Sequence, residues 1–339
     1  MSNDSNMIEA DDVRLTYADG TEAVRGVNLT VPKGEFFGFL GPNGAGKTTT
    51  IKTLTTLLRP TSGTVRINGF DTDEDSRAVR QSIGYMAQET SVDPHLTARE
   101  NIRFACEAYG VPRDERTNRV NELLELVDLA DVADKRSERF SGGMKKRLDV
   151  ATALVHRPQL VFLDEPTTGL DPKARLNLWE YFRKINRQGT TVFLTTQYLE
   201  EADELCDRLS VIQGGKIVAT DSPQALKSRV GGDVLDITIE ESNDEERARA
   251  RRVVIESGLF ADATIETTAD GISLTAKNAR RNGTDLLLAL RNDDFTVVGF
   301  DVRSPTLDDV FLAITGEHVD EVTTGTDTDG ASAAPEVSP

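Results

Sequence analysis

Hydrophobic and polar residues alternate along the first segment of the chain. From residue 7 to 32 the apolar positions recur at about every second residue, and Asp19-Gly20 interrupts them. This period of two predicts a pair of strands joined by a turn. A mostly apolar run at 35–40 and a shorter one at 64–67 predict two further strands.

Helical spacing alternates with these strands. Apolar residues recur at intervals of three and four from Thr48 to Leu58 and again between 96 and 136, and a third helix is expected after Ser141. Two uninterrupted runs, 160–163 and 191–195, are typical of parallel strands buried on both faces. The alternation predicts an α/β fold with a largely parallel sheet.

A second domain is predicted beyond Gly231-Gly232, where the composition changes. The pattern there follows the order β-α-β-β-α-β, which is typical of a small ferredoxin-like α+β domain, over residues 233–316. Residues 317–339 are rich in Thr, Asp, Gly, Ser and Ala and have almost nothing to bury. We therefore expect a main domain over 7–230, a smaller one over 233–316 and a disordered acidic tail.

The charge balance narrows the choice of partners. The 339 residues include 39 Lys and Arg against 57 Asp and Glu, a formal net charge of −18. This argues against nucleic acid as the main partner, because duplex binding needs a basic footprint. Lysine is scarce, with 11 residues against 28 arginines, which favours a halophilic protein from a salt-rich cytoplasm over a merely acidic one.

Neither an anchor nor a leader is predicted. No apolar run approaches the roughly 20 residues that cross a bilayer, and residues 1–6 lack the parts of a signal peptide. Cys106 and Cys206 stand apart, without metal spacing, which favours a reducing cytosol. We expect a soluble, cytoplasmic chain that meets a membrane only through a partner.

A glycine-rich segment between a predicted strand and a predicted helix fits the pattern G-x-x-x-x-G-K-[ST]. It consists of Gly41, Pro42, Asn43, Gly44, Ala45, Gly46, Lys47, Thr48 and Thr49. Its flanks distinguish it from a chance match, because a phosphate-binding loop needs N–H groups at a helix N-terminus. Lys47 would reach the outer phosphates and the Thr48 hydroxyl would bind Mg²⁺. The motif predicts a nucleotide-binding protein.

Two further motifs support this prediction. An apolar strand ends in Asp164-Glu165. At the end of such a strand Asp164 would lie in the coordination sphere of Mg²⁺, and Glu165 would polarise the attacking water. Two such residues alone also fit a solvated turn. Ser141, Gly142 and Gly143 open a helix whose N–H groups suit an anion, although alone they are only a helix cap. As a set, the three motifs resemble the ATPase domain of ABC transporters over roughly residues 7–230.

The resemblance implies roles for four more residues. Tyr17 matches an aromatic residue that stacks on adenine, although it also fits a core-facing strand position. Gln88 matches a glutamine that contacts the metal and the attacking water, although it also fits an ordinary polar loop. It precedes a helical subdomain that the resemblance implies at about 96–157. Asp171 ends a loop that couples two ATP sites. Gln197 stands where most members have a histidine, so it can donate a hydrogen bond to the γ-phosphate but cannot become a cation.

The resemblance also implies a dimer. In this family two ATPase domains enclose two nucleotides, so Ser141, Gly142 and Gly143 would face ATP bound by the other subunit. The sequence has one phosphate loop, which implies a second copy of the chain or a paralogue. The usual glutamine of the signature is Met144 here, which matters little where backbone N–H groups bind the phosphate. Segments 140–144, 197–202 and 305–312 further resemble the daunorubicin-resistance type of ABC-2 exporter ATPase.

The expected function follows from this resemblance. It implies an ATP-hydrolysing subunit that drives a separate transmembrane permease from the inner face of the membrane, with drug or hydrophobic-molecule efflux favoured over ions or lipid-linked cargo. Two alternatives stay open: a soluble ABC ATPase that acts on nucleic acid or ribosomes, and an ATP-dependent dimerisation switch with little turnover. The acidic charge counts against the first, and Asp164 and Glu165 count against the second.

Overall fold

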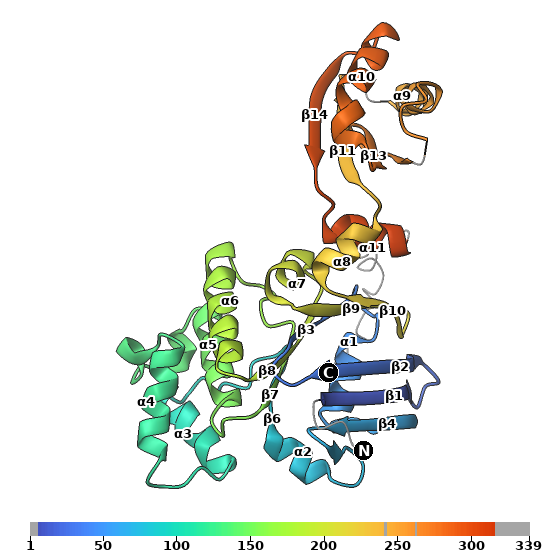
Figure 1. The fold of residues 1–339 in the computed structure, drawn as a ribbon. Coiled ribbons are helices and arrows are strands. Elements are labelled where there is room, and N and C mark those ends of the chain that lie inside the picture. The colour runs from blue at the N-terminus through green and yellow to red at the C-terminus, as the bar shows by residue number, and fades with distance from the viewer. Residues whose placement is uncertain (1–5, 241–242, 262, 316–339) are drawn as a thin grey trace, which may run out of the picture. The chain divides into compact units, whose positions relative to one another are not determined.

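The computed structural model describes residues 6–240, 243–261 and 263–315, so the predicted tail at 317–339 lies outside the described residues (Figure 1). The chain divides into two compact units. The first contains the chain through Tyr198 together with Ser210–Ala219, and the second contains Leu199–Leu209 and Thr220–Thr315. None of the helices in the described ranges is long and apolar enough to cross a membrane.

The described residues form a six-stranded sheet with the order β10-β9-β3-β8-β7-β6. Its strands are β3 (Phe36–Leu40), β6 (Ile83–Met86), β7 (Leu160–Asp164), β8 (Thr191–Thr196), β9 (Arg208–Gln213) and β10 (Lys216–Asp221). The neighbours β3, β8, β7 and β6 run parallel, and every residue of β3, β7 and β8 is buried. The predicted parallel strands are thus confirmed.

A separate antiparallel sheet of the described residues has the order β2-β1-β4-β5. It consists of β1 (Asn6–Thr16), β2 (Glu22–Pro32), β4 (Ser62–Ile67) and β5 (Phe70–Asp71). The predicted hairpin is confirmed, since β1 and β2 pair across the turn at residues 17–21. Their alternation buries one face only, against the parallel sheet, where Ile8 and Val27 join Phe39 and Phe193 in one core.

Helices complete the first unit. They are α1 (Lys47–Leu54), α2 (Ser76–Ser82), α3 (Ala98–Ala108), α4 (Arg116–Leu126), α5 (Gly142–Ala153) and α6 (Pro172–Arg187), with short 3₁₀ turns at Ala130–Val132 and Ser137–Arg139. The predicted helix through Leu58 was too long, because the backbone of Thr56 enters the left-handed region (φ 64°) and ends it. Helices α3, α4 and α5 pack against one another (Figure 1).

The second unit contains a four-stranded antiparallel sheet of described residues with the order β12-β13-β11-β14. Its elements are α7 (Leu199–Leu205), α8 (Pro223–Arg229), β11 (Asp233–Ile239), α9 (Asp244–Glu256), β12 (Thr264–Thr267), β13 (Gly271–Ala276), α10 (Ala279–Asn292), β14 (Val297–Arg303) and α11 (Leu307–Thr315). From β11 to β14 the elements follow the predicted β-α-β-β-α-β order, and helices α9 and α10 cover one face of the sheet.

Helix α10 contains a glycine, Gly283, in its first half. A Cβ atom there would lie 2.9 Å from the Phe300 ring of β14. The glycine therefore allows a close helix-to-sheet contact rather than ending the helix.

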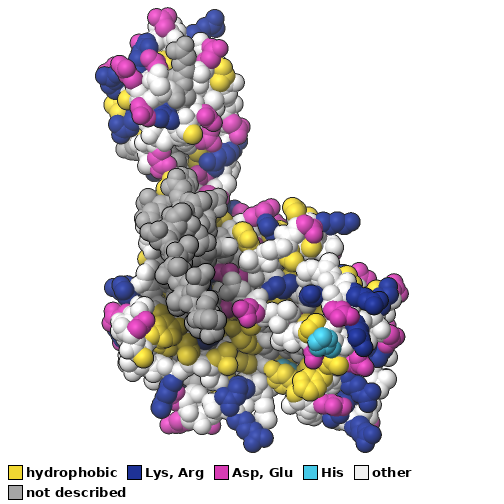
Figure 2. Space-filling view, turned by 180° about the vertical axis from the view of Figure 1, so that it is seen from behind, with side chains coloured by type: hydrophobic (Ala, Val, Ile, Leu, Met, Phe, Trp, Pro, Cys, Tyr) yellow, Lys and Arg dark blue, Asp and Glu magenta, His cyan; other side chains and the backbone are white. Residues whose placement is uncertain are grey.

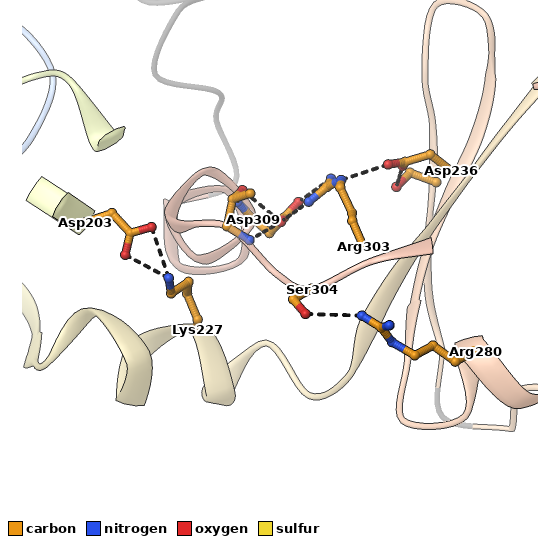
Figure 3. A network of polar contacts seen from close by, with 9 residues as sticks. Asp203, Lys227, Asp236, Arg280, Arg303, Ser304 and Asp309 are labelled. Carbon is orange, nitrogen blue, oxygen red and sulfur yellow. Dashed lines mark hydrogen bonds and ion pairs between the residues drawn. The ribbon is translucent and has the colours of Figure 1, made fainter. Parts of the chain in front are cut away.

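A polar network fixes α11 within the second unit (Figure 3). Arg303 of β14 donates to Asp236 of β11 at 2.9 Å and to both carboxylate oxygens of Asp309 at 2.6 and 3.0 Å. The same Asp309 accepts from the Thr306 N–H at 2.7 Å, which caps the helix. One guanidinium therefore links two strands and a helix.

The aromatic centre of the first unit gives a stability prediction. Phe193 is fully buried, with ring centroids 5.6, 5.7 and 5.3 Å from those of Phe37, Phe39 and Phe162. Phe193→Ala should lower the free energy of unfolding by about 3–5 kcal/mol, because it leaves a cavity. Phe70→Ala, at a ring that is 38% exposed, should cost less than about 1 kcal/mol. Urea titration measures both, and equal losses would contradict the assigned core.

Candidate nucleotide-binding site

Four parallel strands of the first unit end at one edge of the sheet. They lead into the phosphate loop (β3), Gln197 (β8), the pair Asp164-Glu165 (β7) and Gln88 (β6). The register keeps the strand ends level, pairing Leu40 with Thr196, Asp164 with Thr195, and Met86 with Leu163. In open α/β sheets this carboxyl edge is where ligands bind.

The phosphate loop has the backbone that its glycines allow. Gly46 precedes α1 with φ 105°, and an added Cβ atom would lie 2.5 Å from the Ala23 carbonyl oxygen. Gly44 is also left-handed, with φ 79°. The loop therefore turns sharply into a helix whose first N–H groups have no intrahelical acceptor, which is the geometry of an anion site.

Lys47 joins the phosphate loop to Glu165. Its ammonium group donates to the Gly41 and Pro42 carbonyls at 2.7 and 3.1 Å and lies 3.1 Å from Oε1 of Glu165. Both side chains are buried, at 3% and 6% exposure, and Gln88 Nε2 donates to Oε2 of Glu165 at 3.2 Å. The structure thus brings together Lys47, Glu165 and Gln88.

The backbone of Glu165 is unusual. Its φ of 46° lies in the left-handed region, which costs a non-glycine residue energy. Such strained residues cluster at functional sites, where the surrounding structure holds them. The strain sits on the residue that the sequence indicates as catalytic.

Asp164 is almost completely buried beside Thr48. Its Oδ1 accepts hydrogen bonds from the Thr195 hydroxyl at 2.5 Å and the Thr48 hydroxyl at 3.4 Å, whereas Oδ2 is buried with no hydrogen-bond partner among the described residues. Burial raises the pKa of Asp164. Burial together with the Asp164 charge raises the pKa of Tyr85 to about 12.

These groups fit a magnesium ion. An unpartnered, buried carboxylate oxygen and a nearby hydroxyl are hard oxygen ligands of the kind that Mg²⁺ prefers. The described residues contain no group of three His, Cys, Asp or Glu side chains that holds a metal alone. A metal here would depend on nucleotide phosphates for its other ligands.

Helix α5 holds the Gln88 loop. Lys146 donates to the Gln88 carbonyl at 2.7 Å, and the Ser91 hydroxyl donates to Asp149 at 2.5 Å. Burial lowers the pKa of Lys146 and raises that of Asp149. The sequence did not mark Lys146 or Asp149, although both lie on the helix that begins with the Ser-Gly-Gly turn.

The Ser-Gly-Gly turn and Asp171 make local contacts within the chain. Ser141 Oγ accepts from the Met144 N–H at 3.3 Å and caps α5. Asp171 accepts from the Ala174 N–H at 2.9 Å and caps α6. The structure shows a capping role for each residue and does not join either of them to the Lys47–Glu165 cluster.

Tyr17 and Gln197 flank the phosphate loop differently. The Tyr17 hydroxyl lies 2.9 Å from the Thr49 hydroxyl, so this half-exposed ring is tied to the start of α1. Gln197 directly follows β8 and is partly exposed. Its position places it at the sheet edge where the phosphate loop begins.

The fold and the site define a P-loop ATPase domain, and comparison with known proteins gives its family. A family model described as ABC transporter matches residues 24–168, and one described as ATP-binding protein DrrA1-3-like, C-terminal domain, matches residues 222–315. The daunorubicin/doxorubicin resistance ATP-binding protein DrrA of Streptomyces peucetius is 42% identical over 308 residues, which cover 90% of this chain and 92% of that protein. The linearmycin resistance ATP-binding protein LnrL of Bacillus subtilis is 35% identical over 312 residues, which cover 91% of this chain and 98% of that protein.

The chain belongs to the DrrA-type ATP-binding proteins of the ABC transporter family. Two solved structures support the fold. CbiO1 of Clostridium perfringens has a TM-score of 0.62 and 26% identity over 66% of this chain and 91% of its own. A dimeric post-hydrolysis state of the cassette MJ0796 with ADP and phosphate has a TM-score of 0.59 and 29% identity over 64% of this chain and 98% of its own. The chain is thus an ATP-binding, ATP-hydrolysing subunit, as the sequence predicted.

The phosphate loop gives a prediction with a matched control. Gly46→Ala should weaken ADP binding by more than about tenfold, because the new methyl group would meet the Ala23 carbonyl and distort the loop. Gly189→Ala replaces another left-handed glycine, with φ 96° and nothing within 4 Å, and should leave binding within about twofold. Calorimetric titration with ADP measures both, and equal weakening would show that the close contact is unimportant.

Proposed function

We propose that this chain is the ATPase subunit of an ABC exporter, in which ATP binding closes a dimer and drives a separate transmembrane permease. The main support is the buried cluster of Lys47, Asp164 and Glu165 at the sheet edge. A nucleotide clamp without turnover needs no buried carboxylate beside the phosphates, so this pair supports hydrolysis as the working step.

Each residue of the cluster has a role in the proposed reaction. Thr48, Gln88 and Asp164 would hold Mg²⁺, which when bound neutralises charge on the phosphate oxygens. Lys47 would exchange its contact with Glu165 for the outer phosphates. Glu165, released from Lys47 but still near Gln88, would then polarise the attacking water.

The second nucleotide-binding surface is proposed to come from another subunit. Ser141 and Gly142 are exposed, and Gly143 follows them at the start of α5, so their N–H groups would bind the γ-phosphate of the partner's ATP. Asp171 would couple the two sites, and Tyr17 would stack on adenine. The dimeric cassette among the similar structures supports this arrangement, and a homodimer is its simplest form.

The permease, the cargo and the location are proposed from the family. The names of the two relatives concern resistance to daunorubicin, doxorubicin and linearmycin, which favours efflux of drug-like hydrophobic molecules. The chain would act in the cytoplasm, bound to the inner face of the membrane through its permease. We propose an ATPase domain at 7–230 with a helical subdomain at 96–157, and an accessory domain at 233–316.

The surface charge supports two further parts of the proposal. Figure 2 shows acidic side chains interspersed with lysine and arginine over the visible face of the described residues. With a net charge of −18, self-repulsion falls as salt rises, which fits a salt-rich cytoplasm. The same charge makes nucleic acid an unfavourable partner. Experiments on this chain are therefore best made at high salt.

Glu165→Gln tests the function as a whole. It should lower multiple-turnover ATP hydrolysis by at least about 100-fold, because the amide cannot act as a base, whereas Glu180→Gln on the exposed face of α6 should change nothing.

The same variant tests the partner. Stalled with Mg-ATP, the tagged E165Q chain should retain a multi-spanning membrane protein from detergent-solubilised membranes. Recovery of ribosomes or soluble proteins alone would favour a soluble ABC ATPase, and negligible turnover by the wild type would favour a dimerisation switch.

Gln197 gives a separate prediction. Gln197→Ala should lower turnover by about tenfold, the effect of losing one hydrogen bond to the γ-phosphate. Gln197→His should restore turnover and make it pH-dependent near the ordinary imidazole pKa of about 6.5, which the glutamine enzyme should lack. Gln159→Ala, at an exposed glutamine away from the sheet edge where the site lies, is the control. Unchanged turnover in Q197A would show that the assigned role is wrong.

A further inference from the structure

Thr195 contacts both acidic residues of the site, although no motif marks it. It is fully buried near the end of β8, directly opposite Asp164 of β7. Its hydroxyl lies 2.5 Å from Oδ1 of Asp164 and 3.2 Å from the Glu165 backbone N–H. A single side chain therefore touches the two residues proposed for metal binding and catalysis.

The direction of these hydrogen bonds follows from the chemistry of the groups. The Glu165 N–H can only donate, so the Thr195 oxygen accepts from it. A hydroxyl has one proton, and the carboxylate at 2.5 Å is a closer and stronger acceptor than the Leu163 carbonyl at 3.4 Å. The proton is therefore directed at Oδ1 of Asp164.

This donation distinguishes the two oxygens of the Asp164 carboxylate. Oδ1 receives the hydroxyls of Thr195 and Thr48, whereas Oδ2 is buried without a partner among the described residues. A carboxylate free to rotate would exchange these roles. With Oδ1 occupied, Oδ2 stays as the oxygen that a cation can bind.

We propose that Thr195 is a positioning residue, whose hydroxyl fixes the rotation of the Asp164 carboxylate so that Oδ2 is held ready for Mg²⁺. This inference rests on the proposed role of Asp164 as a metal ligand. The alternative is that Thr195 only fills space in the core. Valine has the same shape, so it could then take the place of Thr195 without any effect on Mg²⁺ binding. In Thr195→Val the Glu165 N–H keeps its other acceptor, the backbone carbonyl of residue 195 at 3.1 Å, so the change falls mainly on Asp164.

The test compares ADP affinity in excess EDTA and in saturating MgCl₂, by calorimetry at high salt, so that no turnover is needed. In the wild type Mg²⁺ should tighten ADP binding. In Thr195→Val the gain in ADP affinity caused by Mg²⁺ should be at least about tenfold smaller than in the wild type. The ADP affinity measured in EDTA should stay within about twofold, because only the metal ligand is affected. Thr195→Ser keeps the hydroxyl and should keep the tightening.

Thr191→Val is the matched control. Thr191 is a fully buried threonine at the other end of β8, and its hydroxyl accepts from the Gly34 N–H at 2.8 Å. The same substitution there removes a hydrogen bond from the same strand, so it should lower the unfolding midpoint but not the Mg²⁺ tightening. Loss of tightening in T191V as well would mean that damage to the strand explains the effect, which overturns the proposal.

Two further results separate the inference from the function on which it rests. Full Mg²⁺ tightening in folded T195V would overturn the role of Thr195 and leave Asp164 as a ligand. Absence of tightening in the wild type would overturn the metal assignment of Asp164 and this inference with it. If T195V does not fold, as judged by circular dichroism, Thr195→Ala is measured in its place under the same criteria.

Discussion

The buried ion pair between Lys47 and Glu165 is the interaction on which the site depends. Two charges that are 3% and 6% exposed must have partners, because removing either one leaves the other uncompensated in a poorly solvated place. The pair satisfies both charges and ties the phosphate loop after β3 to the end of β7. In the proposed reaction, a phosphate group that drew Lys47 away would therefore release Glu165 at the same time.

Much of this arrangement could be predicted from the sequence, because its signals are local. The phosphate loop, the strand before Asp164 and the hairpin at 7–32 each lie within a short window whose pattern has few structural solutions. The resemblance to ABC ATPases then added Gln88, which the structure places at Glu165. Local pattern and family motif therefore sufficed for the centre of the site.

The supporting contacts could not be predicted, since they join residues far apart in the sequence. Thr195 meets Asp164 across 31 positions, and Lys146 meets Gln88 across 58. Neither residue type is distinctive, and only the strand register or the packing of α5 brings them to the site. The role of Gly283 could not be predicted for a similar reason, because it depends on the Phe300 ring from another element.

The two carboxylates of the site have contrasting environments, and both would change when Mg-ATP binds. Asp164 is held by hydroxyl groups, with burial raising its pKa and one oxygen without a partner, so a cation would stabilise its charge. Glu165 already has a cation, Lys47, and would become available as a base only when that cation moves to a phosphate. A metal bound to a nucleotide would supply both changes at once, because the metal would bring a positive charge to Asp164 and the phosphates a negative charge to Lys47. Neither metal nor nucleotide alone would do so, and in the proposed reaction this would couple occupation of the site to activation of its base.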